Sequence, residues 1–179
     1  MNLTEIIEEV NKDIDDSLDN GEISGWVNRA LDDLTPIAKA EAKYNSDSAP
    51  FQLPNDFFDI AHLFVGDEEY FPVELNDRVS RGYRLWGKEV TLQKNTGSGE
   101  IELYYYKRLT HLENGDDVPE IDPAFHDLLI LYTIAYSQFA DEEPERQMDA
   151  MNRYFQRKRE FETFASKHSY QTFQIRLVE

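Results

Sequence analysis

Apolar residues near both ends of the chain recur at the spacing of α-helices. Within residues 4–44 they return every three or four positions, with acidic residues between them and a break at Asn20 and Gly21. Within residues 123–166 we expect an almost wholly apolar helix followed by a highly charged one. A helix that is apolar on nearly every side belongs in a core, so these segments predict a helical core.

Residues 51–109, between the predicted helices, have the pattern of short β-strands. Turn signals that contain glycine separate the runs, as at Gly66-Asp67 and Gly87-Lys88. In the stretch EIELYYYK, residues 100–107, apolar side chains occupy every second position, as in a strand with one buried face. The sequence therefore predicts an α+β fold, with a mainly helical core and an inserted small antiparallel β module.

The last residues of the chain alternate in the same way. From Tyr170 to Val178, one side carries Phe173, Ile175 and Leu177, and no hairpin partner lies next to the segment. A strand without a neighbour obtains its backbone partners at the edge of a sheet. That edge belongs either to another chain or to the chain's own β module, and the pattern leaves both open. We predict a strand-like C-terminal tail.

The charge of the chain is strongly negative. The 179 residues include 36 acidic and 18 basic side chains, for a formal net charge of −18 at pH 7. Such a surface repels phosphate backbones, which argues against general nucleic-acid binding. It suits a basic protein partner, a DNA mimic, or a wall past which DNA moves without binding. Solubility alone also explains it.

Other totals narrow the class of protein. Hydrophobic residues make up 40% of the chain, which is enough for a core, and the absence of cysteine excludes disulfides, zinc-thiolate sites and thiol nucleophiles. The N-terminus lacks the basic-then-apolar order of a signal peptide. The most apolar run, residues 128–136, is far shorter than the ~20 residues of a membrane span. We expect a soluble protein made in the cytoplasm, with no membrane partner.

The most tempting metal site is the segment from Asp16 to Val27, which resembles a calcium-binding EF-hand loop. Gly21 falls at the position of the obligatory glycine. However, Leu18 occupies a ligand position, and Val27 stands where a bidentate glutamate is required. The end of one helix and the start of the next account for the same residues, so we predict no calcium site.

No other motif indicates catalysis. The histidines are His62, His111, His126 and His168, and none of them has the spacing of a metal site. The acidic clusters at residues 67–69, 114–117 and 141–145 lie in predicted loops, where carboxylates are ordinarily solvated. Nucleophile-elbow, phosphate-loop and dinucleotide-binding motifs are absent. We therefore predict no catalytic, cofactor or metal site and do not expect an enzyme.

One basic concentration stands out near the C-terminus, in the stretch RYFQRKREF. Its cations are Arg153, Arg157, Lys158 and Arg159, and aromatic residues lie between and beside them. Basic and aromatic residues together can indicate nucleic-acid contact. On so acidic a chain they favour ion pairs with acidic helices, either within a subunit or between neighbouring subunits.

The order of these parts resembles a known family. A helical first third leads into FQLPNDFFDIAHLFV, then IELYYYKRLTHL, and then VPEIDPAFHDLLIL, where an apolar helix runs into a charged one. Over about residues 20 to 165, this order is similar to the adaptor proteins of tailed bacteriophages, also called head–tail connector or head-completion proteins. The shared motifs are structural patterns, without a catalytic signature.

The resemblance implies a structural virion protein with no cofactor. Such proteins assemble in the host bacterial cytoplasm into a ring, usually of twelve copies, at the neck of the virion. The ring lies below the portal, extends the DNA exit channel and carries the next neck or tail-completion protein. DNA passes through it without specific binding. A subunit of this kind can stay monomeric until a portal templates the ring.

The resemblance also implies that a C-terminal segment docks onto the portal. We accordingly divide the chain into one adaptor-like domain, residues 1–166, and a docking tail, residues 167–179. The candidate docking residues are Tyr170, Phe173, Ile175 and Leu177. The four cations of the basic stretch are the candidates for ion pairs between subunits.

Two other functions fit parts of the sequence. An acidic DNA mimic or inhibitor would bind a basic protein partner, and it would be a monomer or dimer with acids at duplex spacing. An enzyme with Mg²⁺ held by carboxylates is the third possibility, and it requires the acidic side chains to be buried.

Overall fold

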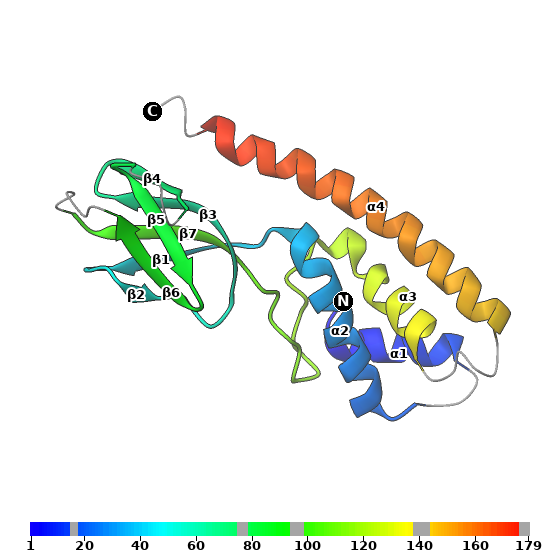
Figure 1. The fold of residues 1–179 in the computed structure, drawn as a ribbon. Helices are drawn as coiled ribbons and strands as arrows, with labels where there is room; N and C mark the ends of the chain where they lie inside the picture. The colour runs from blue at the N-terminus through cyan, green and yellow to red at the C-terminus, as the bar shows by residue number, and fades with distance from the viewer. Residues whose placement is uncertain (15–17, 75–78, 94–98, 138–143, 176–179) are drawn as a thin grey trace. The chain divides into compact units, whose positions relative to one another are not determined.

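The structure is a computed structural model. The parts of the chain that it describes are residues 1–14, 18–74, 79–93, 99–137 and 144–175. The chain divides into two units, each with its own core (Figure 1). The helical unit comprises residues 1–39 and 109–179, and the β unit comprises residues 40–108.

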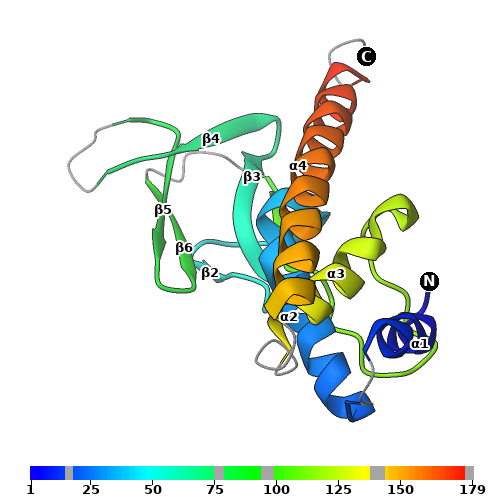
Figure 2. The same cartoon turned by 90° about the vertical axis from the view of Figure 1, so that its right-hand side faces the viewer.

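Four α-helices build the helical unit. They are α1 (Leu3–Asp13), α2 (Asn20–Ala38), α3 (Asp127–Tyr136) and α4 (Pro144–Ile175). A short 3-10 helix, Pro123–Phe125, precedes α3, and the Asp122 side chain caps it by accepting from the Ala124 amide. In both views α4 runs alongside α3 (Figure 1 and Figure 2), and α1 and α2 also pack against α3.

Side chains of the first residues fix where α1 and α2 begin. Asn2 and Glu5 form a capping box at α1, in which each side chain accepts a hydrogen bond from the other residue's backbone amide. The Asp19 carboxylate caps α2 by accepting from the amide of Gly21. These caps satisfy amides that have no partner within a helix.

The core of the helical unit lies around α3. Leu128 and Leu129 are fully buried, and Leu131 is nearly so. The prediction that this apolar segment lies in the core is confirmed. From α4, Tyr154 and Phe161 are buried in the same unit. The charged helix therefore contributes an apolar stripe on one side and its charges on the other.

Seven strands build the β unit. They are β1 (Glu41–Ser46), β2 (Phe51–Gln52), β3 (Phe57–Val65), β4 (Glu68–Pro72), β5 (Gly82–Trp86), β6 (Glu89–Gln93) and β7 (Ile101–Lys107). Their order in the sheet is β1-β7-β3-β4-β5-β6-β2, and all neighbours are antiparallel except β4 and β5. The two edge strands are consecutive in the chain, and the rings of Tyr44 and Phe51 stack with centroids 5.9 Å apart. The sheet thus curls into a nearly closed barrel.

Two tight hairpins set the register of this sheet. The β3–β4 and β5–β6 connections each have two residues, and each begins with a glycine, Gly66 at φ 58° and Gly87 at φ 61°. A positive φ at the first loop position gives the turn a twist that matches the strands. Glycine adopts this conformation without the steric strain that a β-carbon would add.

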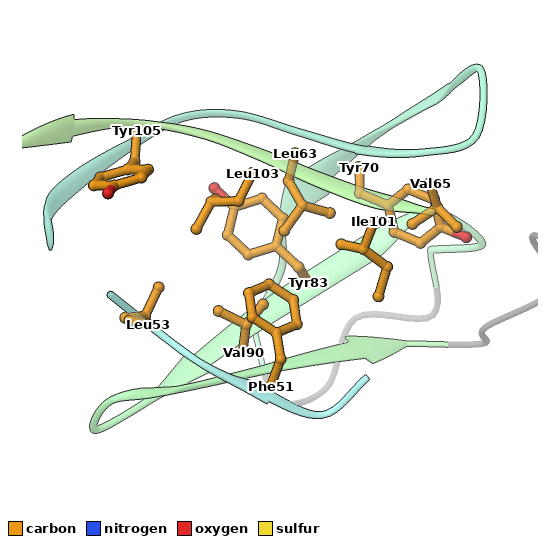
Figure 3. Close-up of a cluster of buried hydrophobic side chains, with 10 residues drawn as sticks. All are labelled: Phe51, Leu53, Leu63, Val65, Tyr70, Tyr83, Val90, Ile101, Leu103 and Tyr105. Atoms are coloured by element: carbon orange, nitrogen blue, oxygen red, sulfur yellow. The ribbon is translucent and has the colours of Figure 1, made fainter. Parts of the chain in front are cut away.

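A core of ten buried side chains fills the β unit. Figure 3 shows Leu63, Leu103 and Tyr105 from one side of the curled sheet facing Val90 and other apolar side chains from the opposite side. Leu63, Leu103 and Val90 have no exposed surface. The β unit therefore has its own hydrophobic core and does not depend on the helices to bury its strands.

The predicted fold class is therefore wrong. The sheet is a seven-stranded, nearly closed barrel with its own core, and it includes one parallel pair, so it is not a small antiparallel module inserted in a mainly helical core. Residues 41–44, which the periodicity placed in a helix, belong instead to β1 (Glu41–Ser46), because this strand pairs with β7, about sixty residues further along. This long-range pairing leaves no local periodic signal.

The predicted strand-like tail is also wrong. Helix α4 continues through Lys167 to Ile175, and residues 176–179 lie outside the described part of the chain. No glycine or proline interrupts residues 145–175, so nothing in the sequence stops the helix at residue 166. A docking role for residues 167–179 stays a prediction.

Candidate functional site

The basic stretch of α4 binds acidic groups of its own unit. Nε of Arg157 lies 2.8 Å from the Asp127 carboxylate of α3, and its Nη1 lies 2.6 Å from Glu160. The hydrogen bond to Glu160, and then the one to Asp127, raise the pKa of the Arg157 guanidinium. The guanidinium also stacks over the ring of Phe125 at 4.6 Å. Arg157 therefore holds α4 against α3.

The next residue makes a second link, to α2. Nζ of Lys158 lies 2.5 Å from the Asp33 carboxylate, and the Tyr154 hydroxyl donates to the same oxygen. Tyr154 is only 1% exposed. Burial, and then the hydrogen bond to Asp33, raise the pKa of this hydroxyl, which keeps it protonated as a donor. The three side chains join α2 to α4.

The other two cations of the stretch are exposed. Arg153 lies 3.8 Å from Asp149, one helical turn away. Arg159 has no ion pair among the residues that the structure describes. Three of the four predicted pairing residues thus have partners within the same chain. Pairing between subunits stays a prediction.

The predicted docking residues are in or beyond the last turns of α4. Tyr170, Phe173 and Ile175 have helical backbone, and Leu177 lies outside the described residues. The alternation that would have placed Phe173 and Ile175 on one side of a strand does not apply.

The histidines have separate surroundings. His62 contacts Glu69 at 2.6 Å in the β unit, and His111 contacts Asp32 at 3.0 Å in the helical unit. His126 is buried, and its pKa is lowered chiefly by that burial. The side chain of His168 is not described. Within the described ranges, no three His, Asp or Glu side chains are placed to hold a metal ion.

The segment that resembled a calcium loop forms the start of a helix. Asp19 caps α2, which begins at Asn20, so the carboxylate binds a backbone amide. Residues 15–17 lie outside the described part of the chain. The described part of the segment is therefore the start of a helix, but Asn20 and Gly21, which were expected to separate two helices, lie in the first turn of α2.

Sequence reasoning missed an exposed basic and aromatic surface in the β unit. We call it the β5 surface, and its members are Phe71, Arg84, Trp86 and Lys88. Trp86 is 81% exposed and Phe71 54%. A sequence signal exists, because residues 78–88 contain four cations and no acid in a chain of net charge −18.

The strand register places these residues on one side of the sheet. Phe71 of β4 pairs with Gly82 of β5, so both point to the same face. Arg84 and Trp86 follow Gly82 at steps of two and share its face. Leu85 pairs with the buried Val90 and points to the opposite, inner face, whereas Lys88 lies in the two-residue turn that follows Trp86. The surface is therefore a continuous strip that ends at an exposed tryptophan.

No helix of the described residues has both the length and the hydropathy needed to cross a bilayer. Comparison with known proteins gives one family match. A family model described as SU10 adaptor protein matches residues 1–172, which include the whole β unit and the helical unit up to the last turns of α4. No curated protein matches the chain significantly.

Proposed function

Because the chain belongs to the SU10 adaptor protein family and is therefore a phage structural adaptor, we propose that it forms a ring below the portal. The ring extends the DNA exit channel and connects the capsid to the tail, with a structural rather than a catalytic role. The observation that carries this proposal is the family match over residues 1–172, which covers both units of the fold. The partners are other copies of the chain, the portal and the next neck protein.

The distribution of charge supports a channel that DNA passes through without binding. The helical unit carries 24 acidic and 10 basic side chains, and the β unit carries 12 and 8. The formal charges of the two units are thus −14 and −4. Acidic walls repel phosphates over roughly the ~8 Å Debye length at physiological salt. A ring lined by the helical unit would therefore let the duplex slide.

Helix α4 is the candidate portal contact. Its 32 residues span about 48 Å at ~1.5 Å per residue. Arg157 fixes the middle of α4 against α3, and Lys158 fixes it against α2. Both contacts lie in the part of the helix formed by residues 144–167. Residues 168–175 continue this anchored helix, and the chain after Lys167 is the part that would meet the portal.

The test is co-purification with the portal encoded by the same genome. Full-length protein is compared with a version that ends at Lys167, which keeps the ion pairs of Arg157 and Lys158 with α3 and α2 and the whole β unit. We expect the full-length chain to bind and the truncated chain to lose binding. If neither binds under conditions in which the portal is assembled, the adaptor role at the portal is contradicted.

The same sample tests the acidic DNA mimic. A mimic would bind basic DNA-binding proteins as a monomer or dimer, and DNA would compete with it for them. The adaptor predicts no competition by DNA for the portal, since the two bind different surfaces. Mg²⁺ is the control for the enzyme alternative, because a folded-state metal site must raise the melting temperature.

A further inference from the structure

The β5 surface has the composition of a protein-binding site. Large exposed apolar side chains that lie together on one solvated face are uncommon, and this strip combines Phe71 and Trp86. Tryptophan and arginine are the residues that most often dominate binding at protein interfaces. Trp86, 81% exposed, is the last residue of β5, directly before the turn glycine Gly87 at φ 61°. The hairpin therefore presents a tryptophan at its exposed end.

The charge of the strip restricts its partner. Residues 78–88 contain four cations and no acid, and of these Arg81, Arg84 and Lys88 lie in the described part. Arg81 is paired with Glu68 at 2.5 Å, and Arg84 donates to the Glu74 carbonyl at 2.9 Å. The side chain of Lys88, next to Trp86, is exposed. An apolar strip edged by cations fits an acidic protein surface.

We propose that the β5 surface docks on the helical unit of a second copy of this chain. The proposal rests on the ring proposed above and identifies its contact between neighbouring subunits. A closed ring uses two different surfaces on each subunit, one for each neighbour. The two units provide such a pair, because the helical unit carries a formal charge of −14 and the strip is locally basic.

The helical unit also offers an apolar counterpart. Met148 is 64% exposed and Phe155 44%, and their spacing of seven residues places them on one face of α4. Contact between unlike surfaces also lowers the repulsion between chains that each carry −18. A second copy therefore satisfies both the charge and the apolar character of the strip.

The first experiment measures assembly on the portal of the Trp86→Ala variant. Phe58→Ala is the matched control, since Phe58 is an exposed aromatic residue of the same unit outside the strip. Neither alanine substitution removes a side chain of the hydrophobic core, and far-UV circular dichroism checks that both variants fold. We expect Trp86→Ala to raise the concentration needed for assembly about tenfold or more, as for a central interface tryptophan, and Phe58→Ala to leave it unchanged. Equal assembly by both variants would overturn the proposal.

The second experiment identifies what the strip touches. The chain has no cysteine, so Lys88→Cys creates a unique site for a photo-crosslinker. Mixing ¹⁵N-labelled and unlabelled copies distinguishes links between copies from links within one. We expect crosslinked peptide pairs in which one peptide is ¹⁵N-labelled and the other is not, and in which residue 88 is joined to residues 1–39 or 109–175 of another copy. Links to the portal, to DNA or only within the same chain overturn the proposal, and Lys43→Cys on β1 is the control position.

These outcomes separate the inference from the function on which it rests. Suppose that the chain binds the portal and assembles, but residue 88 crosslinks to the portal or to nothing. The adaptor role then stands, and the proposed contact between the β5 surface and a second copy is refuted. A chain that does not bind the portal contradicts the adaptor role itself.

Discussion

Replacing Asp33 with alanine should destabilise the helical unit far more than the same change at its neighbour Asp32. Asp33 is the common acceptor of the Tyr154 hydroxyl and the Lys158 ammonium group. Asp32 makes one contact, with His111 at 3.0 Å, and both of these side chains are about half exposed. The two changes have the same helix-propensity effect because both aspartates lie in α2. Their difference therefore isolates the link to α4.

The magnitude follows from what each change leaves behind. Asp33→Ala leaves the hydroxyl of a buried tyrosine without its acceptor, which costs about 1–3 kcal/mol. The partly exposed pair with Lys158 adds at most ~1 kcal/mol. We therefore expect a loss of about 2–3 kcal/mol in the free energy of unfolding. Asp32→Ala should cost below ~0.5 kcal/mol, as exposed ion pairs do.

The assay is urea unfolding followed by circular dichroism at 222 nm, which reports on the helical unit. Adding Tyr154→Phe to Asp33→Ala should recover part of the loss, since removing both partners of a buried hydrogen bond is cheaper than removing one. If Asp33→Ala and Asp32→Ala differ by less than ~0.5 kcal/mol, the link does not hold α4 in the way argued above.

Three further predictions test other parts of the fold. Leu103→Ala in the β core should cost about 2–5 kcal/mol in urea unfolding followed by tryptophan fluorescence, because the side chain is fully buried; a cost below ~1 kcal/mol would contradict that core. Gly25→Ala in α2, where a β-carbon meets nothing within 4 Å, should stabilise the protein by about 0.5–1 kcal/mol. Gly87→Ala, at φ 61°, should destabilise it by about 1 kcal/mol. A change of the same sign for both variants would refute the assignment of a helical backbone to Gly25 and a left-handed one to Gly87. Burial lowers the pKa of His126, so the unfolded chain takes up a proton more readily and stability should fall as the pH drops below about 6.5. His126→Asn should lessen the slope of unfolding free energy against pH between about 7 and 5, and an unchanged slope would contradict this prediction.

Local patterns in the sequence predicted much of the structure. The run of apolar residues in α3 identified a buried helix because burial on nearly all sides leaves no polar face. Alternation in β7 identified its buried residues correctly, since Ile101, Leu103 and Tyr105 face the core. Glycine turn signals marked both two-residue hairpins. In each case, neighbours in the sequence carry the information.

Features that depend on distant residues were not predicted. Strand β1 exists because of its pairing with β7, and its own six residues are mostly exposed and polar. The exposure of Trp86 depends on which side of β5 faces the core, and one strand does not reveal that. The alternation at the C-terminus was misleading. Residues 145–175 contain no glycine or proline, so nothing in this stretch ends helix α4 before the alternating segment.

The basic stretch of α4 shows the same limit. Its charges were expected to pair with acids, and three of the four do within the chain, but the sequence could not assign Arg157 to Asp127 and Lys158 to Asp33. Those assignments leave Arg159 as the cation of the stretch without an ion pair in the described part of the chain.

The central claim, a ring on the portal, is tested most directly by electron cryo-microscopy of the portal mixed with the full-length chain. We expect a closed ring of adaptor copies, coaxial with the portal and open along the DNA path. Density for single copies at scattered positions, or a portal without added density under conditions in which the two proteins co-purify, would contradict the account.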